Sequence, residues 1–170
     1  AIMGNDGYDH IGMIDASGGV LDQDYEMFEQ QTPHLLLQHE YLCDSGGAGE
    51  WRGGLGTVTE ILLRGNDTTM VVFGDGDVEP TYGLFGGKGS VLNKIELRFP
   101  QKHKGRKYLI PLSKDIVSDI PDGTVYYQIA GGGGGYGNPK KRNRKKVMQD
   151  VQNGVVSENC AKKVYGLKSY

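Results

Sequence analysis

Three residues near the start of the sequence carry groups that bind divalent metals, namely Asp6, Asp9 and His10. Carboxylate oxygens and imidazole nitrogens are common ligands of such cations. The same residue types also form turns, and Gly7 stands among them. The sequence therefore favours a plain turn here and keeps the cluster as a candidate metal site.

A second candidate lies in the glycine-rich loop 43–56, which holds the only tryptophan of the chain. Asp44 and Arg52 in this loop could together bind a carboxylate or phosphate, because a guanidinium group makes paired hydrogen bonds to such anions. The same two side chains can instead form an ion pair that fixes the shape of the loop. We favour the structural interpretation.

A third candidate is the glycine run 131–137, in which Gly132, Gly134 and Gly137 satisfy the pattern G-x-G-x-x-G. A dinucleotide site of this kind needs a helix directly after the glycines. Pro139 and a basic loop intervene here, and no Walker loop occurs elsewhere. We therefore expect backbone packed against backbone, or a loop laid along a subunit interface.

The remaining chemical signals are weaker in kind. His34 and His39 are five residues apart and would face opposite sides of one strand, which does not suit a shared metal. The basic run 140–146 has no interleaved aromatic residue, and the pI of about 6.1 does not fit a nucleic-acid-binding protein. We expect no nucleic acid partner, and either a solvated helix start or contact with an acidic subunit surface.

Composition limits the class of protein. Glycine accounts for 28 of 170 residues, without the Gly-X-Y period of collagen, and no apolar stretch reaches the length of a membrane span. Residues 1–100 carry 16 acidic and 5 basic side chains, whereas residues 101–170 carry 5 and 14. We expect no membrane contact, and the two distant cysteines favour a reduced, cytoplasmic setting.

Short β-branched runs bounded by turn residues predict a mainly β fold of sandwich- or barrel-like antiparallel sheets with glycine-rich loops. Residues 57–64 and 68–73, separated by Gly65-Asn66-Asp67, are predicted to pair as a hairpin. Asn143 and Ser157 are expected to cap two short helices. We divide the chain into a β-rich domain at 1–140 and a helical tail at 141–170. The expected strands are 35–42, 57–64, 68–73, 94–99, 107–112 and 124–130.

Four blocks of residues together resemble the hydantoinase B/oxoprolinase family. The first runs from Asp44 to Gly56, the second from Tyr82 to Gly89, the third from Gly132 to Pro139, and the last from Asp150 to Gly166. They stand in the family's order and match roughly the last third of a full member. The opening residues, with Phe28 to Pro33, look more like the ketone-carboxylase branch (acetone and acetophenone carboxylases) than the oxoprolinase branch.

The resemblance implies a piece of an ATP-dependent ketone carboxylase that completes a larger hydantoinase B-like chain and works beside a hydantoinase A-like ATP-binding subunit. The alternatives are a cyclic amide hydrolase (hydantoinase or 5-oxoprolinase) and a non-catalytic assembly module. ATP and a divalent metal are expected in the complex, and no cofactor is assigned to this chain.

The resemblance also implies that the metal and much of the active site belong to the larger part, so no catalytic residue is assigned here. The motif positions are expected to be architectural, to line a substrate channel or to form an interface. They are Asp44, Ser45, Gly46, Gly47, Arg52, Gly53, Gly54, Gly86, Gly87, Gly132, Gly133, Gly134, Gly135 and Tyr136.

Overall fold

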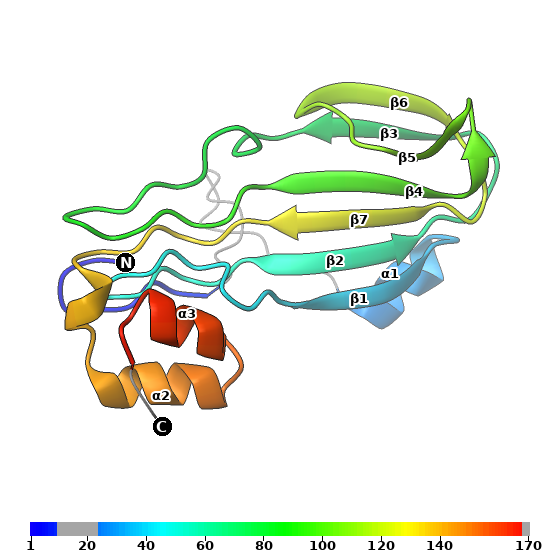
Figure 1. The fold of residues 1–170 in the computed structure, drawn as a ribbon. Coiled ribbons are helices and arrows are strands. Elements are labelled where there is room, and N and C mark those ends of the chain that lie inside the picture. The colour runs from blue at the N-terminus through cyan, green and yellow to red at the C-terminus, as the bar shows by residue number, and fades with distance from the viewer. Residues whose placement is uncertain (10–23, 168–170) are drawn as a thin grey trace, which may run out of the picture.

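The fold is described by a computed structural model, which covers residues 1–9 and 24–167 (Figure 1). Short helices stand near the two ends of the chain and strands fill the middle. The elements in chain order are α1 Tyr25–Gln31, β1 Leu35–Tyr41, β2 Thr57–Leu62, β3 Thr68–Phe73, β4 Lys94–His103, β5 Arg106–Leu109, β6 Lys114–Ile120, β7 Val125–Ala130, the 3-10 helix η1 Pro139–Lys141, α2 Arg144–Gln152 and α3 Glu158–Lys163.

Five strands form one antiparallel sheet in the order β1-β2-β7-β4-β5. In its centre β7 pairs with β2 from Thr57↔Ala130 to Leu62↔Val125, and on its other side with β4. Because antiparallel neighbours run in opposite directions, the last residues of β1 and β7 lie beside the first residues of β2 and β4, all at the same end of the strands. The glycine-rich segments that continue these strands therefore emerge side by side (Figure 1).

The remaining two strands, β3 and β6, pair antiparallel as a separate ribbon. Met70 and Val117 of this ribbon pack against the buried cluster of Leu63, Leu97 and Ile120, so the ribbon covers part of one face of the large sheet. The expectation of a mainly β, sandwich-like antiparallel fold is confirmed. The large sheet is open, with β1 and β5 at its edges.

The predicted hairpin between 57–64 and 68–73 is wrong, because β2 and β3 belong to different sheets. After β2, the amide of Leu63 donates to the carbonyl of Thr124 (2.8 Å), the residue before β7, so the pairing of the two strands continues one residue further. Gly65 and Asp67, both at positive φ, then turn the chain out to the second layer. The sequence also did not predict β6, nor did it distinguish α1 from a strand.

The predicted helix caps at Asn143 and Ser157 are confirmed. The Asn143 side chain accepts from the amide of Lys145, and that of Ser157 accepts from the amide of Cys160. Gly154 follows α2 at φ 73°, the left-handed conformation that commonly ends a helix. Cys160, Ala161 and Tyr165 belong to the apolar cluster that joins the two helices to Ala48 in the first glycine-rich loop.

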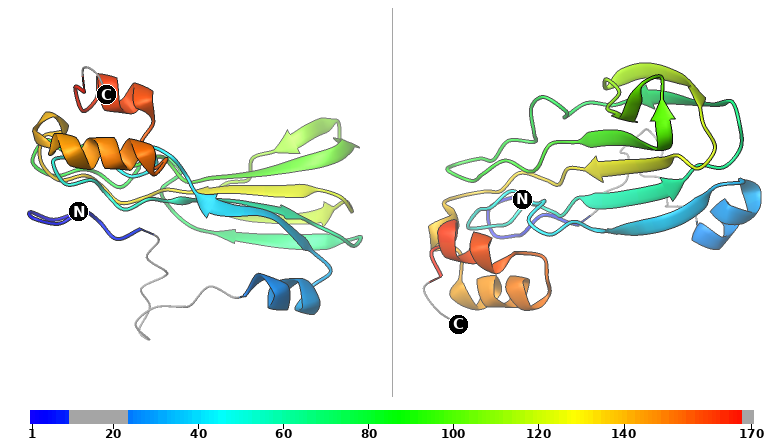
Figure 2. Two further views of the ribbon diagram at one scale, coloured as in Figure 1. Left: turned by 90° about the horizontal axis from the view of Figure 1, so that it is seen from below. Right: turned by 45° about the vertical axis from the view of Figure 1, so that its right-hand side comes forward.

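Figure 2 shows the two C-terminal helices lying against the glycine-rich loops, away from α1 at the far end of the sheet. The N-terminal segment also lies beside these loops. No helix in the described ranges is long and apolar enough to cross a membrane.

Candidate functional site

Three glycine-rich segments at one end of the sheet make a layer held by backbone hydrogen bonds. We call them loop 1 (residues 43–56), loop 2 (residues 82–91) and loop 3 (residues 131–138). Loop 1 bonds loop 3 through Gly47 N to Gly133 O (2.8 Å), and Trp51 and Tyr136 exchange bonds of 3.0 and 2.9 Å. Loop 2 donates from Lys88 N to Ala48 O (2.7 Å) and accepts at the Lys88 carbonyl from Gly135 N (3.0 Å).

The backbones in this layer approach so closely that side chains do not fit. A Cβ placed on Gly53 would meet the Gly133 carbonyl, and one on Gly134 would meet the Tyr82 carbonyl, both below the 3.0 Å that real Cβ atoms respect. Because the obstructing atoms are backbone, no rotamer change relieves the clash. The same holds for other predicted motif positions, namely Gly46, Gly47, Gly54, Gly87, Gly132 and Gly135.

Two glycines of the predicted set differ from the others. Gly86 has no atom closer than 3.9 Å to an added Cβ, and its φ of 93° gives it a turn role instead. Gly133 would bring a Cβ to 3.3 Å from Gly54 N, which is tight but not forbidden. Gly86 is therefore required by its backbone conformation, whereas Gly133 is the position of the predicted set that is only tight.

The polar motif residues of loop 1 hold the loop ends. The buried Ser45 hydroxyl donates to the Leu42 carbonyl and accepts from the Gly56 amide at 2.8 Å, which closes the base of the loop. Asp44, at φ 61°, accepts from the Ser157 amide at 2.9 Å and so joins the loop to α3. The ion pair between Asp44 and Arg52 that the sequence suggested is not among those of the described residues, and Arg52 faces Asp9 and Asp150 instead.

Beside the layer of glycine-rich loops, Arg142 is the centre of an ionic network. Its guanidinium bonds Asp6 at 2.6 and 3.1 Å and Asp150 at 2.8 and 3.0 Å, and its side chain is 1% exposed. It also donates to the Glu50 carbonyl of loop 1. One buried side chain thus connects the N-terminal segment, loop 1 and α2.

Arg52 extends the network on the other side. Its Nη1 bonds Asp9 at 3.2 Å and the Gly53 carbonyl at 2.7 Å, and its amide donates to Asp6. Its buried Nε has no hydrogen-bond partner and lies 3.9 Å from Asp150. Asp9 in turn accepts from the Leu55 amide at 2.8 Å.

The charges of this network balance. Asp6, Asp9 and Asp150 face Arg52, Arg142 and Lys146, whose ammonium lies 3.5 Å from Asp6 and 4.8 Å from the Trp51 ring centre. Burial would raise the pKa of Asp6, but the hydrogen bond and charge of Arg142 outweigh it and hold that pKa below its usual value. For Arg142, burial is likewise outweighed by Asp6 and Asp150, and its pKa is raised. The network therefore supplies no net charge for a ligand.

Metal binding by Asp6, Asp9 and His10 stays a prediction. Both aspartates already accept bonds from arginine and from backbone amides, and His10 lies outside the described residues. Within residues 1–9 and 24–167 no three potential ligands gather as a metal would require. His34 and His39 contact the Arg64 amide and the Thr59 hydroxyl respectively.

The sequence reasoning missed Arg142 and Asp150. Arg142 stood inside the basic run 140–146, where its neighbours Lys141 and Arg144 are exposed. A signal was present, because Asn143 caps α2 and therefore places Val147 and Asp150 on one buried face of that helix. Nothing in the sequence linked this face to Asp6.

The fold and the site together define a β-rich protein in which three glycine-rich loops pack backbone against backbone at one end of the large sheet. The aspartates and arginines beside this glycine scaffold, namely Asp6, Asp9, Asp150, Arg52 and Arg142, are paired with one another. The chain belongs to the hydantoinase B/oxoprolinase family, whose model matches residues 1–139.

One curated relative and two solved structures illustrate the similarity. Caprolactamase subunit beta of Pseudomonas jessenii is 34% identical over 95% of this chain and 28% of its own length. The crystal structure of ATP-dependent caprolactamase from the same organism matches with 31% identity and a TM-score of 0.75, over 90% of this chain and 26% of that one. A nucleotide-free structure of acetone carboxylase, described as ATP-dependent, matches with 25% identity and a TM-score of 0.74, over 95% and 25%. The chain thus spans about a quarter of the length of these relatives.

Proposed function

We propose that this chain is the glycine-scaffold piece of a hydantoinase B-like component in an ATP-dependent enzyme complex. The observation that carries the proposal is an exposed apolar face on the β3–β6 ribbon. Phe73 is 88% exposed, Val71 71% and Ile116 67%, and Val71 pairs directly with Ile116 across the ribbon. A continuous apolar strand face of this kind normally packs against protein.

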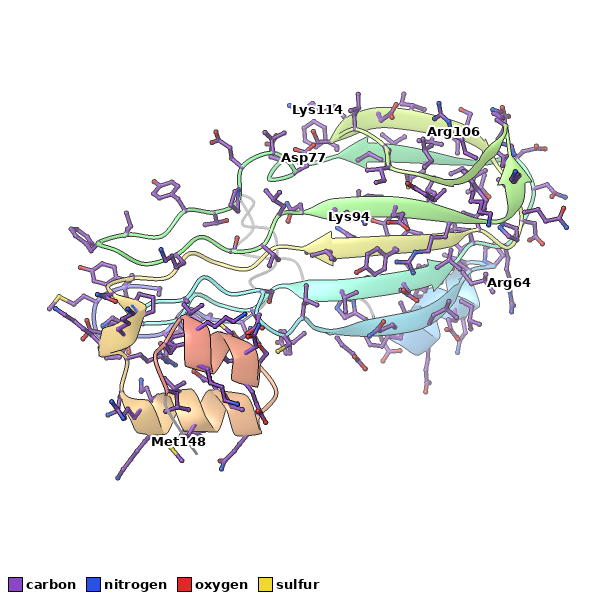
Figure 3. The ribbon with its side chains drawn as sticks, in the orientation of Figure 1. Arg64, Asp77, Lys94, Arg106, Lys114 and Met148 are labelled. Atoms are coloured by element: carbon purple, nitrogen blue, oxygen red, sulfur yellow. The ribbon has the colours of Figure 1, made fainter. Side chains whose placement is uncertain are left out.

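The surroundings of this face agree with a covering partner. Figure 3 shows Lys114 and Asp77 at one end of the ribbon, with Arg64 and Arg106 toward the other end of the molecule. Lys114 lies 5.9 Å from the Phe73 ring centre and 3.9 Å from Asp75, so charged groups border the apolar face. Apolar centres with charged rims are the usual composition of protein interfaces.

The partner we propose is the larger hydantoinase B-like chain, since the relatives are about four times longer. A hydantoinase A-like ATP-binding subunit would join the complex, together with ATP and a divalent metal held outside this chain. In this assembly the motif residues, from Asp44 to Tyr136, are architectural. We propose a cytoplasmic location, because two cysteines among 170 residues fit a reduced compartment.

Two reactions are candidates for the complex. Ketone carboxylation, our expectation from the sequence, is supported by the match to acetone carboxylase. Ring opening of a cyclic amide is supported by the higher identity to caprolactamase. Assay of the purified complex separates them: bicarbonate-dependent ATP turnover with a ketone indicates the carboxylase, and lactam or hydantoin cleavage without bicarbonate indicates the hydrolase.

The assembly itself is tested by expressing the tagged chain in its own host. We expect it to retain a longer hydantoinase B-like chain and an ATP-binding chain. A chain that purifies alone as a monomer and melts in one sharp transition contradicts the proposal. A stable complex without ATP turnover on either substrate class would favour the assembly module.

A further inference from the structure

We infer that a groove between loop 2, η1 and α3 binds an acidic segment of the larger hydantoinase B-like chain, an inference that rests on the proposed function. The groove encloses about 500 Å³ and is lined by Phe85, Lys88, Asn138, Lys140, Lys163 and Val164. We call it the basic groove. Its residues come from three segments that are far apart in the sequence and meet only in the folded chain.

The lysines of the basic groove carry uncompensated charge. Lys88, Lys140 and Lys163 are exposed, and none of the ion pairs among the described residues includes them. This contrasts with the ionic network of Arg52 and Arg142, in which each arginine faces carboxylates. Three unpaired ammonium groups around one hollow favour an anionic occupant.

Phe85 supplies the second, independent observation. Its side chain is 76% exposed, yet its backbone has a φ of 51°, a conformation that bulky residues rarely adopt. Its ring contacts the Tyr136 ring at a centroid distance of 5.0 Å. This φ belongs to the turn at Phe85-Gly86, which a hydrogen bond from the Gly87 amide to the Leu84 carbonyl closes at 2.9 Å. The turn presents an exposed aromatic ring beside the basic groove, and aromatic rings are enriched in protein interfaces.

The two observations together select the occupant. An apolar ring beside three lysines fits a peptide that carries both carboxylates and an apolar side chain. A polynucleotide fits less well, because residues 1–100 carry 16 acidic and 5 basic side chains and would repel it. The relatives extend about three quarters of their length beyond the matched part, so a long partner segment is available.

The test uses the tagged chain purified from its host with its partners. A carbodiimide cross-linker joins lysine amines directly to carboxylates, and peptide mapping identifies the joined residues. We expect Lys88, Lys140 or Lys163 to be joined to an Asp- or Glu-rich segment of the larger chain. The paired substitution Lys88→Glu/Lys163→Glu should lower retention of that chain at least tenfold. The control Lys102→Glu/Lys107→Glu makes the same charge change at exposed positions of β4 and β5 and should alter retention less than twofold.

A second variant separates binding from folding. Phe85→Gly removes the ring while glycine accepts the positive φ more readily, so the secondary structure should persist by circular dichroism as retention falls. Normal retention in both groove variants would overturn the inference while leaving the proposed function intact. Absence of any larger chain from the unaltered preparation would overturn both. The inference would also be overturned if the groove variants kept the larger chain but lost binding to a single-stranded oligonucleotide that the unaltered chain binds.

Discussion

Arg142 makes charged hydrogen bonds to two carboxylates, Asp6 and Asp150, and its side chain is buried. Replacing it with alanine would leave Asp6 and Asp150 as partly buried carboxylates without their main partner. We expect Arg142→Ala to lower the free energy of unfolding by about 3–5 kcal/mol, the usual cost of breaking a buried ion pair from one side. Urea unfolding of the protein as it is purified measures this loss.

The matched control for that prediction is Arg144→Ala. Arg144 stands two residues away, at the exposed start of α2, and none of the described ion pairs includes it. We expect its removal to change the free energy of unfolding by less than about 0.5 kcal/mol. Equal effects of the two substitutions would mean that the network does not stabilise the fold.

Tyr126 sets a limit at high pH. Burial raises the pKa of Tyr126 from 10.0 to about 12, and its hydroxyl donates to Gln128 at 2.8 Å. Between those two pH values the unfolded chain loses the phenol proton and the folded chain keeps it, so stability falls as pH rises. Tyr126→Phe should remove on the order of 1–2 kcal/mol of the decline between pH 10 and 12, after allowance for partial solvent exposure. Unfolding midpoints at pH 9 and 11.5 give the comparison, and identical slopes would contradict it.

At this scale the sequence predicted which residues are chemically notable but not how they pair. Asp6, Asp9 and Arg52 were identified, yet Arg52 was matched with Asp44, eight residues away. The actual partners require contacts such as Arg142 to Asp6, across 136 positions of sequence. Local spacing carries no information about such contacts.

Among the elements, the layer of glycine-rich loops makes the sharpest prediction. Gly134→Ala places a methyl group on the Tyr82 carbonyl, whereas Gly133→Ala meets its nearest atom at 3.3 Å. We expect Gly134→Ala to cost more than about 3 kcal/mol, beyond ordinary overpacking, and Gly133→Ala to cost clearly less. Midpoints of urea unfolding for the two neighbours provide the measurement.

Gly74→Ala serves as the control outside the layer. Gly74 has no atom within 4 Å of an added Cβ and does not have a positive φ. Replacing it should be neutral or slightly stabilising, because alanine reduces the freedom of the unfolded chain. Similar losses at Gly133 and Gly134 would show that close backbone contact does not explain the glycine run.

The elements themselves were largely predictable because their signals are local. The capping residues Asn143 and Ser157 predicted the starts of α2 and α3, and the β-branched runs predicted β2 and β3. Strand pairing was not predictable in the same way. Gly65-Asn66-Asp67 has hairpin chemistry, but Leu63 still bonds to Thr124 beside β7, and β3 beyond the turn pairs with β6 in the second sheet.

For the whole molecule, the apolar face of the β3–β6 ribbon predicts the behaviour of the chain without its partner. We expect the isolated chain to self-associate, and the variant Val71→Thr/Phe73→Ser/Ile116→Thr to shift it toward the monomer. Light scattering coupled to size-exclusion chromatography measures the shift. The same variant should lose the larger chain in co-purification, and unchanged mass in the first measurement would argue against an interface on this face.

The position of Arg142 has a consequence for synthesis on the ribosome. Loop 1 is made early, but its hydrogen-bond partners in loop 3 and its buried arginine emerge about 80 to 90 residues later. Contacts of such long sequence separation form slowly, because the chain must close large loops before they contribute. Loop 1 therefore cannot complete its native hydrogen bonds until residues 131–142 have left the ribosome, and the rate of translation sets the earliest moment at which this loop acquires its final shape.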